Sequence, residues 1–177
     1  MPMISVAYAT SRSEAGLNAA VAKAASDLAA QTLHKDPKVA AVQVQAVDPA
    51  DWFCAGHALV QSGLAAFWLE IRITEGTNTK DEKAAFIAAV FKRMGELLGP
   101  LHDNSYVYAH DARADGYGFS GVTAERRYVA GKLGAKLSAA ARLRATGPNR
   151  RSNSCRSATS ISGSVTARPR SARLVRP

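Results

Sequence analysis

The residue with the most distinctive chemistry lies at the start of the chain, where Pro2 follows Met1. A small second residue permits removal of the initiator methionine, which would leave Pro2 with a free secondary amine. An ordinary α-amino group titrates at about pH 8, and a proline amine starts somewhat higher. Apolar surroundings or a neighbouring cation must therefore lower its pKa before it can accept a proton at neutral pH. Pro2 is a candidate general base, and the alternative is that it is merely part of a frayed end.

The first half of the chain must position this group. The stretch from Pro2 to Ser13 is interpreted as a short alternating strand and the turn after it. A helix is predicted from about Glu14 to Thr32, because apolar residues recur there at three- and four-residue steps. Ser11 or Ser13 is expected to cap this helix, and the sequence before Pro37 ends it. Residues 38–47 alternate again and predict a second strand.

The second half repeats this order. Residues 66–74 form the most regular alternating stretch, with Phe67, Leu69, Ile71 and Ile73 on the side expected to face helices. Thr79 and Glu82 form a capping box for a helix that ends at Gly99-Pro100. A strand over 104–110 follows. The glycine-rich stretch 115–121 is interpreted as a turn or small hairpin that precedes no convincing helix.

The order of elements therefore indicates two βαβ units, over about 2–64 and 65–130, in an α/β fold. Each crossover helix lies on a sheet face, with right-handed connections, so we expect a four-stranded sheet with both helices on one face. Trp68, Tyr106 and Tyr108 would lie on the other face, which is too apolar for open water. This pattern predicts that a partner subunit covers that face.

The sequence resembles the tautomerase superfamily, in its 4-oxalocrotonate tautomerase-like long form with two fused βαβ units, over roughly residues 2–128. The resemblance lies in Pro2, the strand behind it, Arg12-Ser13 before a helix, and the stretch 75–82 that opens the second helix. It implies a cofactor-free keto–enol isomerase of a small carboxylate-bearing acid, with Pro2 as general base, assembled as a homotrimer. Dehalogenation, hydration or decarboxylation within the same superfamily, or a non-catalytic homotrimer, are the alternatives.

The resemblance also implies roles for particular residues. Arg12 is expected to bind the substrate carboxylate, although it could equally be a solvated arginine. A second cation is usual, but its family positions hold Gln43, Thr77 and Tyr106 here. Arg72 and Lys38 are possible substitutes, and a salt bridge from Arg72 to Glu70 or Glu75 is the alternative for Arg72. The remaining expected substrate-binding residues are aromatic: Trp52, Phe53, Tyr106 and Tyr117.

The basic character of the chain belongs to its C-terminal part. The formal net charge is +9, yet residues 1–133 contain 13 Lys/Arg and 14 Asp/Glu, while residues 134–177 contain 10 Lys/Arg and no acid. We expect a tautomerase-like domain over 2–133 and a basic tail over 134–177, disordered from about Thr146. Nucleic acid could bind only through that tail, to which we assign no function.

Composition excludes several other classes. The sequence lacks an apolar run long enough for a bilayer and lacks a signal peptide, so a cytoplasmic location is expected. Cys54 and Cys155 form no disulfide or zinc pattern, and the four histidines lack metal-ligand spacing. We therefore expect neither a metal nor a cofactor.

Overall fold

The computed structural model describes the backbone of residues 2–145 and the side chains of residues 2–134. The chain divides into two units, 1–137 and 138–177, and the sheet with its two long helices belongs to the first. The disorder expected from Thr146 lies outside the described residues.

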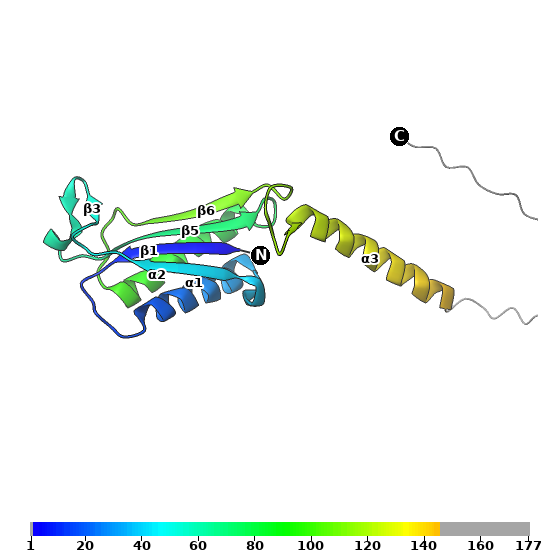
Figure 1. The fold of residues 1–177 in the computed structure, drawn as a ribbon, viewed down its shortest axis with the longest axis horizontal. Coiled ribbons are helices and arrows are strands. Elements are labelled where there is room, and N and C mark those ends of the chain that lie inside the picture. Colours follow the sequence, from blue (N-terminus) through cyan, green and yellow to red (C-terminus); the bar gives the residue numbers. More distant parts are fainter. Residues whose placement is uncertain (1, 146–177) are drawn as a thin grey trace, which may run out of the picture. The chain divides into compact units, whose positions relative to one another are not determined.

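Four strands form a mixed sheet: β1 (Met3–Ala9), β2 (Ala41–Ala46), β5 (Ala66–Thr74) and β6 (Tyr106–Ala112). Their order is β2-β1-β5-β6. Within each repeat the strands are parallel, whereas the two repeats meet through the antiparallel pair β1 and β5. Helices α1 (Leu17–Leu33) and α2 (Lys80–Leu98) cover one face, as Figure 1 shows. The expected tandem βαβ architecture is therefore confirmed.

The core lies between the sheet and these two helices. The expected row of β5, Phe67, Leu69, Ile71 and Ile73, is at most 1% exposed, because period-two alternation directs it to the helix side. Side chains spaced by three or four residues meet it from the helices, such as Val21 of α1 and Phe86 of α2, both fully buried. Apolar burial of this kind is the main stabilising contribution to such a layer.

The ends of the helices agree with the sequence in one repeat and differ in the other. The capping box at Thr79 and Glu82 is present, and α2 ends at Gly99 with a φ of 102°. At α1 the expected serine cap is wrong: Gly16 is the N-cap, with a φ of 83° and no side-chain cap hydrogen bond. Because glycine adopts this left-handed conformation without steric cost, the chain turns at Gly16 and the helix begins three residues later than expected.

The connecting segments contain short elements that the alternation did not reveal. A 3₁₀ turn, η1 (Pro37–Val39), precedes β2, so the strand expected from Lys38 begins only at Ala41. The loop after β2 folds into a hairpin of β3 (Phe53–Cys54) and β4 (His57–Ala58), followed by the 3₁₀ turn η2 (Leu59–Gln61).

The glycine-rich stretch forms the expected small hairpin, of β7 (Gly118–Phe119) and β8 (Val122–Thr123). The expectation that no helix follows it is wrong, because α3 (Ala124–Ala145) begins directly after β8. Residues 125–134 of α3 are all exposed. A helix without a buried face has no apolar period to detect, which explains why the sequence pattern missed it.

The sheet face opposite α1 and α2 carries exposed aromatic side chains. Trp68, Tyr106 and Tyr108 are 43%, 55% and 48% exposed, and the rings of Trp68 and Tyr106 lie 6.0 Å apart. Such a surface is typical of a contact with another chain. Among the described helices, none is long and apolar enough to cross a membrane.

Candidate active site

The N-terminal end of the sheet is the end where β1 begins, and it contains Pro2. Pro2 is buried, and its carbonyl accepts a hydrogen bond of 3.2 Å from the amide of Ala41. The antiparallel register places Arg72 directly opposite Met3, and the parallel register places His110 opposite Arg72. Pairing of the two repeats therefore brings Arg72 next to the residue that follows Pro2.

Tyr117 approaches the same place from the loop before β7. Its hydroxyl donates a hydrogen bond of 3.4 Å to the carbonyl of Arg72. Burial raises the pKa of Tyr117, while a hydrogen bond with the backbone of Met3 and the charge of Arg72 lower it by less. The hydroxyl therefore stays protonated at neutral pH, and its proton is the one that donates to the carbonyl of Arg72.

Arg72 is positioned by a carboxylate. Its Nε donates to Oε1 of Glu70 at 2.9 Å, and the Glu70 side chain is only 20% exposed. The alternative interpretation of Arg72, a salt bridge with Glu70, is therefore confirmed. Within the described part of the chain, no protein acceptor contacts the terminal nitrogens Nη1 and Nη2, so these donors can still receive a ligand.

Lys38 also belongs to the N-terminal end of the sheet. It lies in η1, directly before β2, and β2 begins with Ala41 opposite Met3. Its side chain is exposed, and its amide donates to Oδ1 of Asp36 at 2.9 Å. The backbone thus brings Pro2, Lys38, Arg72 and Tyr117 to one end of the sheet.

Arg12 lies at the opposite end of the sheet, which we call the hairpin end because β3 and β4 lie there (Figure 1). β1, with 7 residues, separates Arg12 from Pro2 by about 20 Å. Nη1 of Arg12 donates to the carbonyls of Glu96 and Leu97, each at 3.1 Å. These carbonyls belong to the last turn of α2, where a cation satisfies unpaired acceptors and interacts favourably with the helix dipole.

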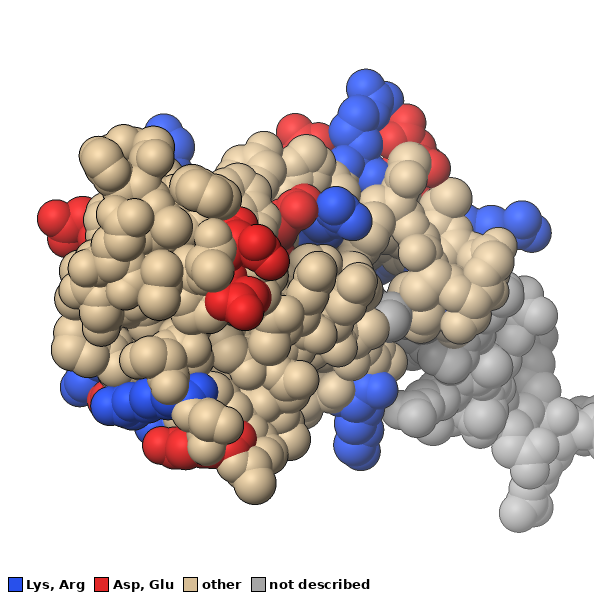
Figure 2. Space-filling view, turned by 60° about the vertical axis from the view of Figure 1, so that its left-hand side comes forward, with Lys and Arg blue, Asp and Glu red and all other residues tan. Residues whose placement is uncertain are grey.

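The other aromatic residues that were expected to bind substrate also lie at the hairpin end. Trp52, Phe53 and Tyr106 line a hollow of about 390 Å³, together with Asp51 and Asn104. Phe53 is 64% exposed. Figure 2, turned so that this end comes forward, shows a broad uncharged surface interrupted by a few charged side chains. Within one chain, this aromatic group does not surround Pro2.

Sequence reasoning assigned no role at the N-terminal end to Tyr108, His110 or Lys35. The Tyr108 hydroxyl and His110 Nδ1 are 3.1 Å apart, beside Glu70 and Arg72 in the strand register. The alternation along β6 had already placed Tyr108 on this face, and His110 follows it by two residues and so shares the face. Lys35 has no such signal: its ammonium donates to Oγ1 of Thr77 at 2.9 Å across two loops, and burial lowers its pKa despite nearby carboxylates.

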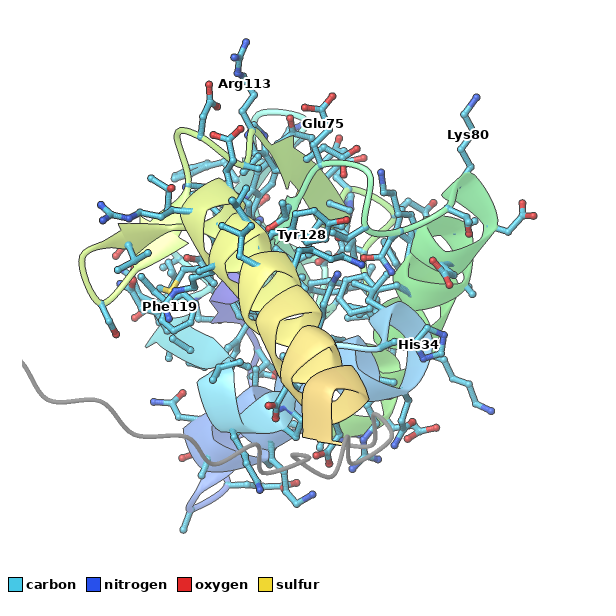
Figure 3. All side chains as sticks on the ribbon, turned by 90° about the vertical axis from the view of Figure 1, so that its right-hand side faces the viewer. His34, Glu75, Lys80, Arg113, Phe119 and Tyr128 are labelled. Carbon is cyan, nitrogen blue, oxygen red and sulfur yellow. The ribbon has the colours of Figure 1, made fainter. Side chains whose placement is uncertain are left out.

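A larger hollow, of about 550 Å³, lies beyond the carboxyl end of β5. It is lined by the loop 74–77, Phe119 of β7 and the first residues of α3, including Glu125 and Tyr128. Figure 3 looks onto this end and shows Glu75, Phe119 and Tyr128 around it. Among the described residues, no group of three or more histidine, cysteine, aspartate or glutamate side chains could hold a metal ion.

Comparisons with known proteins support the fold. No protein-family model matches the sequence, and no curated protein was found to be similar. Solved structures do match. The symmetric trimer of a fused 4-OT has a TM-score of 0.60 and 22% sequence identity, and the match covers 70% of this chain and 96% of that one.

Two further structures show the same likeness. Pt0534 inactivated by 2-oxo-3-pentynoate has a TM-score of 0.61 and 18% identity, with 71% of this chain and 98% of that one covered. A macrophage migration inhibitory factor-like protein from Entamoeba histolytica has a TM-score of 0.56 and 15% identity, with 69% and 97% covered. Since these proteins are nearly fully covered, the likeness extends over their whole fold. This chain therefore has the tandem βαβ fold of the fused 4-OT proteins.

Proposed function

We propose that this chain is a cofactor-independent tautomerase that moves a proton between carbon and oxygen of a small carboxylate-bearing enol or keto acid. The observation that carries the proposal is the convergence at Pro2. This residue is buried at the start of a central strand. Arg72 lies opposite its neighbour Met3, and the Tyr117 hydroxyl interacts with the backbone of that neighbour.

Each of these groups has a role that its chemistry permits. Once Met1 is removed, the neutral amine of Pro2 takes a proton from the enol hydroxyl and returns a proton to carbon, which converts the enol into the ketone. Arg72 holds the substrate carboxylate through its free Nη donors. Tyr117 exchanges its long hydrogen bond to the Arg72 carbonyl for one to the oxygen that carries enolate charge in the transition state. No proton or electron is left over, so the reaction requires no cofactor.

We further propose that the working form is a homotrimer in which each site contains groups from two copies. The fused 4-OT structure with this fold is described as a trimer, and the exposed aromatic face of this chain requires a cover. Phe53 and Arg12 lie about a strand length from Pro2 in their own chain. A neighbouring copy could bring its hairpin end to this Pro2 and supply the apolar wall that keeps the amine neutral.

The chemistry of an inactivator tests the role of Pro2 directly. Pt0534 is described as inactivated by 2-oxo-3-pentynoate, a carboxylate with a triple bond conjugated to a ketone. A neutral Pro2 amine would add to the far alkyne carbon, and the amine proton would pass to the adjacent carbon. Because nothing leaves, the protein should gain the mass of one whole inhibitor per chain.

Intact-mass spectrometry and peptide mapping give the decisive measurement. We expect a mature chain that lacks Met1 and carries a single label on Pro2. If the mature chain keeps Met1, the Pro2 nitrogen lies in a peptide bond and cannot act as a base. If the label is instead on another residue, Pro2 lacks the proposed reactivity. Either result would overturn the proposal.

A further inference from the structure

The ion pair between Glu70 and Arg72 uses the Nε of the guanidinium and does not use Nη1 or Nη2. Glu70 Oε1 accepts from Nε at 2.9 Å. A carboxylate ligand can bind an arginine in two bidentate ways, either along Nε and one Nη or end-on across Nη1 and Nη2. Because Glu70 occupies Nε, the end-on pair is the bidentate site that remains.

We propose that Glu70 is a positioning residue that sets how strongly this site binds carboxylates; this inference rests on the proposed function. Glu70 fixes the guanidinium so that Nη1 and Nη2 remain available for an end-on ligand. Its negative charge also repels that ligand and weakens binding. The salt bridge and the substrate-binding role of Arg72 are therefore compatible, and together they restrict the site to weakly held, rapidly released acids.

The surroundings of Glu70 support a fixed orientation. The register places Ser5 of β1 and Tyr108 of β6 on either side of Glu70, in the row next to Arg72. The Glu70 side chain is 20% exposed, whereas that of Arg72 is 47% exposed. A carboxylate held between two neighbouring strands loses little further freedom when it orients a longer, more exposed side chain.

Two substitutions separate orientation from charge. Glu70→Gln keeps an oxygen that accepts from Nε but removes the negative charge, so we expect KM for an enol acid to fall about two- to fivefold, the range for a partly screened charge. Glu70→Ala removes both effects, so its KM should exceed that of Glu70→Gln by about tenfold, the loss of one charge-assisted hydrogen bond. In both variants kcat should change less than KM.

The matched control is Glu96→Gln, which removes a carboxylate from another ion pair, with Arg93 on α2 at 2.7 Å. This variant should leave KM unchanged. In an Arg72→Ala background, Glu70→Gln and Glu70→Ala should have equal KM values, because both lack the charge and the orienting hydrogen bond acts only through Arg72. Equal KM values for the two variants when Arg72 is present, or a tenfold difference between them that persists without Arg72, would overturn the inference. Tm values identify a variant that has simply lost its fold.

Binding of a non-reacting acid keeps this test independent of turnover. Calorimetry with fumarate, a dicarboxylate that cannot enolise, should show the same order of affinity: Glu70→Gln above wild type, and wild type above Glu70→Ala. If wild type binds fumarate in this order but converts no enol acid, the proposed function fails and the role of Glu70 stands. If wild type turns over but the order is absent, the role of Glu70 fails alone.

Discussion

The two ends of the sheet differ in what their charged side chains contact. At the N-terminal end, Pro2, Arg72 and Tyr117 come from three separate segments: strand pairing places Arg72 opposite Met3, and the Tyr117 hydroxyl donates to the carbonyl of Arg72. At the hairpin end, Arg12 is engaged with the last carbonyls of α2, and Thr10 Oγ1 donates to the carbonyl of Leu98 at 2.7 Å. A cation therefore has a structural role at one end and an available binding edge at the other.

This difference teaches that residue type and spacing do not assign a role on their own. Arg12 was expected from the resemblance to bind the substrate carboxylate, yet within one chain its guanidinium supports a helix end. Arg72 belongs to no sequence motif that would mark it as a binding residue, but strand pairing brings it next to Met3. The predictions that follow test each end against the other.

The largest effect is expected for Pro2→Ala. This substitution keeps a small second residue but replaces the cyclic secondary amine with a primary one, so turnover of phenylenolpyruvate or 2-hydroxymuconate should fall by about 10²- to 10⁴-fold. Ultraviolet absorbance of the enol measures the rate. An unchanged rate in the variant would remove Pro2 from the reaction.

Arg72→Ala should show that the N-terminal end holds the carboxylate. Loss of a hydrogen-bonded cation costs about 1.5–3 kcal/mol, so kcat/KM should fall by roughly 10- to 100-fold, mainly through KM. Arg93→Ala, which removes another exposed arginine that forms an ion pair, is the matched control and should have wild-type kinetics. Similar losses in both variants would indicate a general charge effect in place of a specific contact.

Mixing two defective variants tests whether the two ends meet between copies. Pro2→Ala and Phe53→Ala should each be impaired when pure. Mixed trimers, formed by unfolding and refolding the two together, contain contacts between a native Pro2 and a neighbour's native Phe53, so activity should recover severalfold above the mean of the pure variants. Recovery that never exceeds this mean would place the complete site within one chain.

Arg12→Ala should mainly affect stability. Its two carbonyl contacts are similar in kind to a helix cap worth about 1 kcal/mol, so Tm should fall by about 2–4 °C. Thermal unfolding followed by circular dichroism provides the measurement. A large rise in KM with an unchanged Tm would instead show that Arg12 binds substrate in a neighbouring copy.

The smallest expected effect concerns two tyrosines, one toward each end. Burial raises the pKa of both Tyr8 and Tyr117 above the ordinary value of 10.0. Because the folded state retains the proton longer than the unfolded state, their stabilising contribution is complete below about pH 10 and is lost as pH rises through the folded pKa values. Urea midpoints between about pH 8 and pH 11 should show this decline, and Tyr8→Phe or Tyr117→Phe should make it shallower.

Much of the fold could be predicted from local patterns. The alternation of β5 and the capping box at Thr79 each identify an element within a few residues, and the structure confirms both. The serine cap of α1 failed because Gly16 adopts a left-handed conformation that overrides the capping preference of Ser13. Helix α3 was missed because residues 125–134 bury no face that would impose a period.

The sequence by itself determined the two βαβ repeats and the candidate base, because strand alternation, helix caps and the position of a proline are local properties. Only the tertiary structure decided which candidates lie together. The antiparallel pairing of β1 with β5 places Arg72 opposite Met3 and leaves Arg12 a strand length away. Register between distant segments is set by the whole buried face of the sheet, so local spacing along the chain does not reveal it.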